Sequence, residues 1–226
     1  MNTKYVDKYT MTQEQNIFYA KRNLVDYIWK SARMENIAVT YPDTDAIMKG
    51  ARISNLTMDE VVTINNLKHA WQFILETLSY PTNYAFVCEL NKKIGANLVY
   101  GAGSVRNMPV NIGGTNWIPD LPIESIIKEE IEPIIQIESV TDRALTLVLY
   151  LMRKQIFLDG NKRTALMAGN HILISNGAGI LTISVDLHSK FFTLLLDFYT
   201  SNDNREVKDF LYDNCIDGLV NDGGTT

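Results

Sequence analysis

The chain has 226 residues, of which 46% are hydrophobic and 21% charged, and its formal net charge is −5. This length and hydrophobic content are sufficient for one sizeable core, so we expect a single compact unit. The negative net charge argues against a nucleic-acid partner, because binding to nucleic acid needs lysine and arginine gathered on one surface. The longest strongly apolar run, residues 144–152, is too short to span a bilayer, and we expect no membrane partner.

Cysteine usage indicates the compartment. Cys88 and Cys215 are the only cysteines, and they lie far apart without the spacing of a metal site. We interpret them as reduced thiols in the core. The charged residues Lys4, Asp7 and Lys8 precede any apolar run, which argues against an export signal. The sequence therefore favours a cytoplasmic protein.

Helical periodicity dominates the sequence. A capping box of Thr12 and Gln15 opens a helix that is expected to continue to about residue 33. A second capping box, Thr57 with Glu60, opens a long amphipathic helix that ends before residue 81. Further helical patterns cover residues 83–94, 123–132, 141–156, 161–175, 185–199 and 203–215. The predicted fold is all-α, with the nearly all-apolar segment 141–156 as its central helix.

Residues 99–122 break the helical pattern. Four glycines flank short extended runs there, and three prolines exclude a long helix. The pattern predicts a small β-hairpin or an extended flap that can dock a partner. No repeat or linker divides the chain. We expect an N-terminal helical lobe over residues 1–55, a helical core over 56–216 and a flexible tail over 217–226, together forming one compact unit.

The most informative segment is residues 153–165, RKQIFLDGNKRTA, which connects two predicted helices. Phe157 is expected to anchor this segment in the core, and Gly160 permits a tight turn that a side chain would obstruct. The next helix is expected to begin at Asn161. A helix N-terminus offers unpaired backbone N–H groups and the positive end of the helix dipole, which together favour an anion such as a phosphate.

An acid and two cations complete this segment. Lys162 and Arg163 add full positive charge beside the helix N-terminus. Asp159 next to bound phosphates is a suitable Mg²⁺ ligand, because hard cations take carboxylate and phosphate oxygens together. An Asp-Gly-Asn turn is also ordinary loop chemistry between helices. These residues alone therefore leave two interpretations open, a phosphate-binding loop and a purely structural turn.

The longer string favours the first interpretation. FLDGNKRTA after a buried helix resembles the Fic/Doc family signature HxFx[D/E]GN[G/K]R, with Gln155 at the position of the histidine. The segment 31–36, SARMEN, resembles the family's inhibitory-helix motif Ser/Thr-x-x-x-Glu-Gly/Asn, whose defined positions are Ser31, Glu35 and Asn36. An alternative is that Glu35 is a solvated acid near a helix end and Asn36 its left-handed cap.

A third resemblance lies in residues 105–122, which are similar to the flap that aligns the target's side chain in this family. The positions expected to dock the target are Val105, Arg106, Val110 and Ile112. The resemblance implies a helical Fic fold that transfers AMP from ATP, with Mg²⁺, to a hydroxyl of a target protein.

The resemblance also implies roles for the residues of the loop. Asp159 would hold Mg²⁺, Asn161 and the backbone of residues 160–163 would cradle the phosphates, and Arg163 would stabilise charge on the transferring group. Lysine at position 162 is typical of the Doc-like branch, which transfers phosphate instead of AMP. The orientation of the donor therefore stays open.

Two departures from the family pattern bear on activity. Gln155 stands where the histidine acts as general base, and a neutral amide can orient a hydroxyl but cannot take its proton near pH 7. Leu166 stands where the family has a second arginine, so we expect Glu35 to lack a strong ionic partner.

Several functions remain open. The sequence is compatible with a weak or inactive AMP transferase, a degenerate nucleotide- or protein-binding regulator, a Doc-like phosphotransferase, and a helical interaction protein without a ligand. The sequence leaves open the identity of the target protein and whether the protein forms a homo-oligomer.

Overall fold

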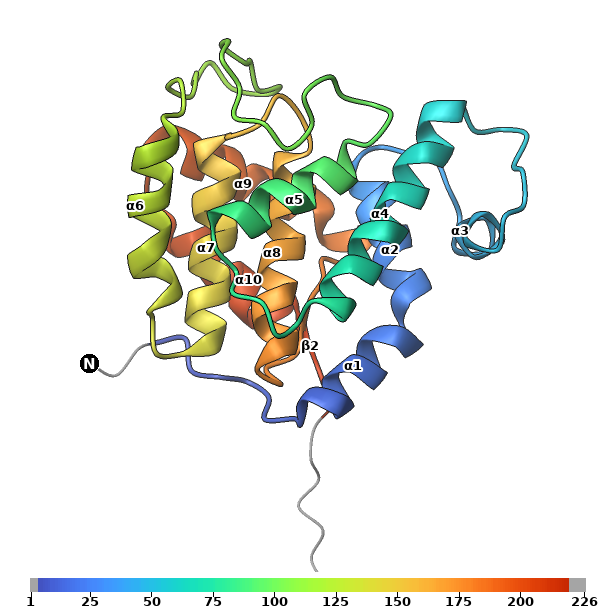
Figure 1. The fold of residues 1–226 in the computed structure, drawn as a ribbon, viewed down its shortest axis with the longest axis horizontal. Helices are drawn as coiled ribbons and strands as arrows, with labels where there is room; N and C mark the ends of the chain where they lie inside the picture. Colours follow the sequence, from blue (N-terminus) through green and yellow to red (C-terminus); the bar gives the residue numbers. More distant parts are fainter. Residues whose placement is uncertain (1–3, 220–226) are drawn as a thin grey trace, which may run out of the picture.

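The computed structural model describes residues 4–219, and this part of the chain folds into ten α-helices with one small antiparallel sheet (Figure 1). The first helices are α1 (Gln13–Arg22), α2 (Leu24–Met34), α3 (Tyr41–Met48), α4 (Met58–Glu76) and α5 (Tyr84–Ile94). They are followed by α6 (Glu124–Ile135), α7 (Val140–Lys154), α8 (Asn161–Ser175), α9 (His188–Ser201) and α10 (Arg205–Asn214). The prediction of an all-α fold is confirmed. Within the described residues, none of the helices has the length and apolar character needed to cross a membrane.

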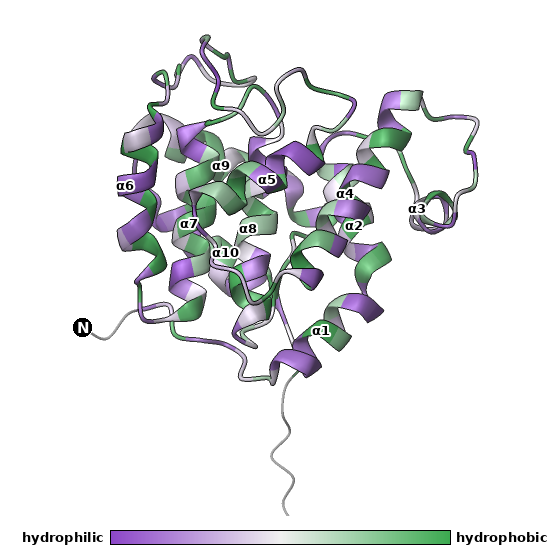
Figure 2. Ribbon diagram, viewed as in Figure 1, coloured by the Kyte–Doolittle hydropathy of each residue, from purple (hydrophilic) through white to green (hydrophobic). Residues whose placement is uncertain are grey.

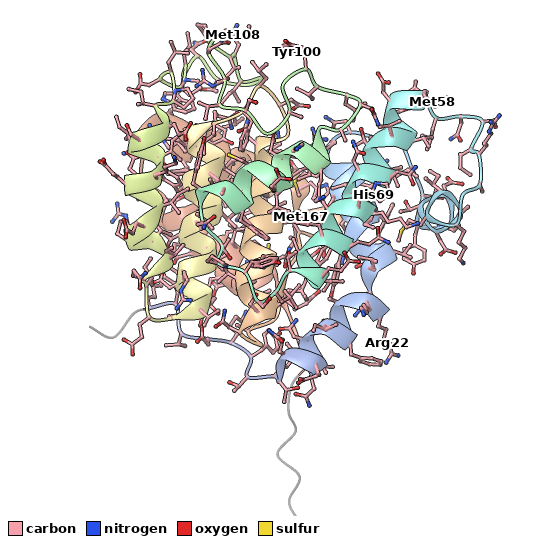
Figure 3. All side chains as sticks on the ribbon, in the orientation of Figure 1. Arg22, Met58, His69, Tyr100, Met108 and Met167 are labelled. Atoms are coloured by element: carbon pink, nitrogen blue, oxygen red, sulfur yellow. The ribbon has the colours of Figure 1, made fainter. Side chains whose placement is uncertain are left out.

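Helix α8 is the centre of the bundle. It packs against α7, α5 and α4, and 13 of its 15 residues are buried (Figure 1). Met167, labelled in Figure 3, lies in this interior and is 2% exposed. We expected α7 to be central, but Thr146 and Tyr150 leave one of its faces half-exposed. None of the 15 residues of α7 is exposed, so α7 is a buried helix as predicted, and α8 lies still deeper although it contains polar residues.

These polar residues are hydrogen-bonded inside the core. The Asn170 side chain donates to the carbonyl of Leu181 (2.9 Å) and accepts from the N–H of the same residue (2.7 Å). The His171 ring lies 2.6 Å from the Thr82 hydroxyl and 3.0 Å from the Thr77 carbonyl. Burying polar groups costs little when each has a partner, so α8 can occupy the centre.

A glycine sets the distance between α7 and α8. A Cβ atom added at Gly169 would lie 2.4 Å from Cγ2 of Val148, which no real side chain tolerates. The two helices therefore approach more closely than two side chains would allow. Their close antiparallel packing fixes the connection from residue 155 to 160, which begins at the end of α7 and ends at the start of α8.

The outer helices cover this centre. Figure 2 shows bands of hydrophilic and hydrophobic residues on α6 at the edge of the bundle, as expected for a helix with one buried side. The N-terminal helices share the same core, because α2 packs on α4 and the Tyr27 ring stacks on Trp71 with centroids 5.5 Å apart. The proposed boundary near residue 55 stays a prediction.

The helices agree with the sequence patterns except at three places. The expected helix from residue 12 to 33 is interrupted at Asn23, whose side-chain amide donates to the Tyr19 carbonyl and ends α1. Helix α3 was not predicted, although Thr40 and Asp43 form a capping box there. The pattern over 185–199 begins as a 3₁₀ turn, η1 (Val185–Leu187), before α9.

The small sheet lies far from the predicted hairpin. Strand β1 (Ile180–Leu181) pairs with β2 (Ile216–Asp217) in antiparallel register, with Ile180 opposite Asp217. Asp217 is thus part of the sheet, and the flexible tail cannot begin there. The rest of the expected tail, residues 220–226, lies outside the described residues.

Residues 99–122, which we call the flap loop, form no hairpin. They run irregularly over the top of the bundle in Figure 1, with Tyr100 and Met108 at its outer edge in Figure 3. The prediction of a β-hairpin was wrong because Arg106 binds the carbonyls of this segment. Its guanidinium donates to the carbonyls of Met108, Pro119 and Asp120 inside the loop.

Arg106 also fastens the flap loop to the bundle. Its Nε donates to the Gln155 carbonyl (2.7 Å), its backbone N–H donates to Ile156 (2.9 Å), and the residue is 3% exposed. We therefore expect Arg106→Met to leave the carbonyls of Gln155 and Pro119 without donors, at a cost of about 1–3 kcal/mol each in the free energy of unfolding. Urea denaturation measures this loss. Arg22→Met, at an exposed helix end, is the control; equal stability of the two variants would contradict the role of Arg106.

The burial of His171 predicts a pH dependence. Burial lowers the pKa of His171 below its usual 6.5, so the unfolded chain binds the proton first as the pH falls. The contribution of the neutral ring to stability is therefore complete above about pH 6.5 and is lost at lower pH. The difference in unfolding free energy between wild type and His171→Gln should shrink from about pH 8 to about pH 5.5. A difference that stays constant over this pH range would contradict the prediction. The pKa of His188 is also lowered, but His188 is present in both proteins, so its effect cancels in the comparison.

Candidate functional site

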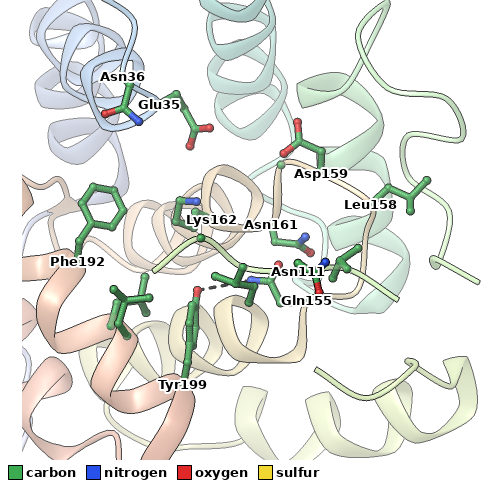
Figure 4. A pocket seen from close by; sticks show the side chains of 16 residues that line it. Glu35, Asn36, Asn111, Gln155, Leu158, Asp159, Asn161, Lys162, Phe192 and Tyr199 are labelled. Atoms are coloured by element: carbon green, nitrogen blue, oxygen red, sulfur yellow. Dashed lines mark hydrogen bonds between the residues drawn. The ribbon is translucent and has the colours of Figure 1, made fainter. Parts of the chain in front are cut away.

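A pocket of about 450 Å³ lies where four distant segments meet (Figure 4). Its floor is the segment 158–162 between α7 and α8, and its walls come from residues 110–113 of the flap loop and from α9. Glu35 and Asn36, at the end of α2, close the remaining side. The fold thus brings the predicted phosphate loop, the flap and the inhibitory-like motif to one place.

Two residues with positive φ shape the segment between α7 and α8. Gln155 ends α7 in the left-handed conformation (φ 48°), and Gly160 precedes α8 with φ 77°. The positive φ of Gly160 favours glycine, and a Cβ atom there would also be tight, at 3.1 Å from side-chain atoms of both Asn91 and Ile94. Helix α8 begins at Asn161, as predicted, and Phe157 is buried in the core.

The N-terminus of α8 is left free for an anion. Gly160 at the N-cap provides no side-chain hydrogen bond to the first turn. The Asn161 side chain does not cap the helix either, because its amide donates to the Phe157 carbonyl (2.8 Å) and accepts from the Phe157 N–H (3.0 Å). Asn161 therefore fixes the loop with its side chain, and what it can offer a phosphate is its backbone N–H.

Asn91 is a positioning residue that the sequence analysis missed. It is 1% exposed, and its side chain donates to the Asp159 carbonyl (2.9 Å) and to the Thr164 hydroxyl (3.1 Å). It also accepts from the N–H of Gly103 (2.8 Å) in the flap loop. One amide thus joins α5, the segment 158–162 that is predicted to bind phosphate, and the flap loop. An asparagine on the apolar face of the predicted helix 83–94 was the available signal.

Arg163 connects the two acids of the site. Its Nη2 donates to Asp159 (3.0 Å), and its Nε lies 3.4 Å from Oε2 of Glu35. The second contact is an ion pair without hydrogen-bond geometry, since Nε is buried with no hydrogen-bond partner. Arg163 is 7% exposed and faces these carboxylates rather than the pocket.

Glu35 therefore has an ionic partner, contrary to the expectation drawn from Leu166. Leu166 is buried within α8, 7% exposed, and cannot pair with an acid. Arg163, three residues earlier, contacts the carboxylate instead. Asn36 has φ 62°, as expected for the left-handed cap at the end of α2. It also lines the pocket, so both interpretations of this residue hold. The Ser31 hydroxyl donates to the Tyr27 carbonyl in its own helix and lies outside the pocket lining.

The charges that face the pocket come from Lys162, Asp159 and Glu35. Lys162 is half-buried and forms no ion pair with any described residue. The Asp159 side chain is 60% exposed, and Figure 4 shows the Glu35 carboxylate pointing into the pocket above the loop. No group of three histidine, cysteine or acidic side chains forms a metal site among the described residues. Mg²⁺ would thus need oxygens from a bound phosphate in addition to Asp159.

The position of the expected base is occupied by a hydrogen-bonded amide. The Gln155 Nε2 donates to the Met152 carbonyl (2.5 Å) and lies 3.5 Å from the Tyr199 hydroxyl, the contact drawn in Figure 4. Burial raises the pKa of Tyr199 well above its usual value, so this hydroxyl stays protonated. The described lining contains no histidine. The pocket thus has hydrogen-bond donors near Gln155, and its described lining offers no imidazole to act as the base.

The docking residues expected in the flap loop divide into two groups. Val110 and Ile112 line the pocket, where they are half-buried. Val105 packs against the core outside the pocket, and Arg106 is buried under the loop. Arg106 holds the flap in place and has no surface to offer a target, which corrects its predicted role.

Comparisons with known proteins identify the architecture. A family model, Fic/DOC family, matches residues 81–173, from before α5 nearly to the end of α8. The structure is similar to a Fic-1 fragment from C. elegans, with a TM-score of 0.72 and 18% sequence identity over 87% of this chain and 62% of that one. The chain thus spans less than two thirds of that fragment. No match was found among curated proteins.

Two bacterial structures are similar to the same degree. A Fic domain containing signaling protein from Bacteroides thetaiotaomicron has a TM-score of 0.71 and 16% identity, covering 89% of this chain and 87% of that one. A Fic family protein from Desulfovibrio desulfuricans has a TM-score of 0.69 and 15% identity, covering 91% and 66%. At these identities the likeness concerns the fold. Residues 81–173 are therefore a Fic/DOC family domain, and the chain around them has the fold of Fic-domain proteins.

Proposed function

We propose that this protein binds ATP with Mg²⁺ in the pocket above α8 and is built as a Fic-type protein AMP transferase whose transfer step is slow. The observation that carries the proposal is the uncapped N-terminus of α8 beside Lys162, a cation without an ion pair among the described residues, within a Fic/DOC domain. Free N–H groups and an unpaired ammonium group at one place favour a phosphate group.

The remaining parts of the pocket suit the rest of the nucleotide. The exposed carboxylate of Asp159 lies at the loop, where it can share Mg²⁺ with phosphate oxygens. The ion would supply charge neutralisation during transfer. Phe192, Leu195 and Tyr199 give the wall formed by α9 an apolar surface for a planar base.

Arg163 is the residue that the proposal requires to change partners. Its guanidinium is bound to Asp159 and Glu35, so a phosphate has to compete with the Glu35 carboxylate for it. The end of α2 therefore opposes the use of Arg163 in transfer. Phosphate binding at the α8 N-terminus and Lys162 does not require this ion pair to open.

The transfer step is where the site is weakest. Gln155 can orient a target hydroxyl delivered by the flap loop, yet its Nε2 is already bonded to the Met152 carbonyl. Removal of the hydroxyl proton then depends on water or on the target itself. The target is proposed to be a protein, as the family resemblance implies.

A second candidate function is a regulator that binds nucleotide or a protein without transfer. The absence of a histidine from the described pocket lining favours it. A Doc-like phosphotransferase, which transfers phosphate instead of AMP, is a further alternative, and Lys162 at the loop is the residue that favours it. Product analysis separates the two chemistries, because one adds AMP and the other adds phosphate.

Neutralising Lys162 tests nucleotide binding. We expect Lys162→Gln to weaken the binding of Mg-ATP about 10- to 100-fold in isothermal titration calorimetry, since a charged hydrogen bond contributes about 1.5–3 kcal/mol. Lys154→Gln is the matched control, because Lys154 pairs with Glu130 outside the pocket. Equal affinities of the two variants would contradict the proposed phosphate site, and no heat with wild type would leave only the protein-binding function.

Restoring the base tests the transfer step. Incubation with ATP labelled on the α-phosphate and a cell lysate should label a protein with wild type, and Gln155→His should increase the rate about 10²- to 10⁴-fold. The double variant Gln155→His/Arg163→Ala is the negative control. If only Gln155→His labels a protein, the wild-type protein is not a slow transferase and the regulator function is favoured. If ATP labelled on the γ-phosphate gives label and ATP labelled on the α-phosphate does not, the Doc-like reaction is favoured.

A further inference from the structure

We propose that the protein has a second binding site, for a singly charged carboxylate attached to a planar apolar group, on the opposite side of Trp117 from the nucleotide pocket. A cavity of about 710 Å³ lies between residues 117–121 of the flap loop, α6, α7 and the turn from α9 to α10. It shares no lining residue with the nucleotide pocket. Its size is typical of sites for small molecules.

Arg153 is the anchor of the proposed site. It lines the cavity near the end of α7, and its Nε is buried without a hydrogen-bond partner. Its guanidinium lies 4.8 Å from the ring centre of Trp117 and 5.9 Å from that of Phe198. No described carboxylate forms an ion pair with it. Arg153 is half-buried, and its buried Nε–H would gain a hydrogen bond from an anionic acceptor.

The other cations of the cavity already have partners. Lys154 donates to Glu130 (2.5 Å), and the Nε of Arg205 donates to both oxygens of Asp203 (2.9 and 3.0 Å). Arg153 is thus the unpaired cation among the described residues of this lining. An arriving anion would therefore bind at Arg153 without first breaking an ion pair.

The charge balance defines the class of ligand. Three cations line the cavity together with three acids, Asp120, Glu130 and Asp203, so the described lining is neutral as a whole. A dianionic phosphate would keep one negative charge uncompensated, because Arg153 is the single unpaired cation of the described lining, whereas one carboxylate matches the charge and the fork of one guanidinium. The rings of Trp117 and Phe198 next to Arg153, and the Tyr150 ring elsewhere in the lining, favour a planar apolar group beside that carboxylate.

The two pockets share a wall of stacked rings. Trp117 faces the second cavity and stacks on Tyr199, which lines the nucleotide pocket, with ring centres 5.4 Å apart. Tyr199 in turn lies beside Gln155. A ligand at Arg153 would thus contact the Trp117 ring, which packs against Tyr199 beside Gln155 in the nucleotide pocket.

Two sources can provide an aromatic carboxylate. One is a free aromatic acid, and the other is the carboxyl-terminal aromatic residue of a partner protein. Both present a single carboxylate next to a ring, and they differ in the amide that precedes the residue in a protein. Benzoate and N-acetylphenylalanine serve as probes for the two sources.

Ligand-observed NMR titration tests the site. Benzoate should bind wild type at least about 10-fold more tightly than the neutral isostere benzamide, because the charged contact to Arg153 is lost in the amide. Arg153→Gln should abolish this preference, whereas Lys162→Gln, with the same loss of charge in the other pocket, should retain it. Tighter binding of N-acetylphenylalanine than of benzoate would indicate a protein terminus, and the reverse order would indicate a free acid.

Three outcomes would overturn the proposal. They are equal binding of benzoate and benzamide to wild type, an unchanged preference in Arg153→Gln, and a loss of the preference in Lys162→Gln, which would place the probe in the nucleotide pocket. The comparison of the two probes needs only wild type and is unaffected if a variant fails to fold. Circular dichroism of Arg153→Gln and of Arg153→Lys checks that the variants retain the helical fold.

Discussion

The two ion pairs of Arg163 hold the candidate site together. The guanidinium contacts Asp159 at 3.0 Å and Glu35 at 3.4 Å, and it thereby joins the first turn of α8, the phosphate loop and the end of α2. Because Arg163 is only 7% exposed, these carboxylates compensate a buried positive charge. The same contacts that stabilise the pocket also occupy the arginine that transfer would need. In the proposed function, stability and transfer therefore compete for one side chain.

Binding and transfer consequently depend on different parts of the structure. The N-terminus of α8 is preformed by the positive φ values of Gln155 and Gly160 and by the buried amide of Asn91. A phosphate group needs no rearrangement of this turn. Transfer requires Arg163 to leave Glu35 and also requires a proton acceptor, which Gln155 is not. In the proposed function, the protein is thus better equipped to bind a nucleotide than to catalyse the transfer step.

Local patterns predicted most of the fold, and long-range contacts account for the rest. Helical periodicity and capping boxes located α4, α5 and α7, and the signature located the turn before Asn161. The flap loop was misread because short runs between glycines suggest strands, while the buried Arg106 that binds their carbonyls looks like any surface arginine in sequence. Glu35 was assigned no partner because spacing along α8 cannot show which arginine faces α2.

The most direct test of the account is a crystal structure of the protein with a non-hydrolysable ATP analogue and Mg²⁺. We predict that the phosphates lie over the N-terminus of α8 within hydrogen-bond distance of Lys162, with the ion bound to Asp159 and the base against α9. Gln155 should retain its bond to Met152. A nucleotide bound elsewhere, or a pocket that stays empty at saturating analogue, would contradict the account.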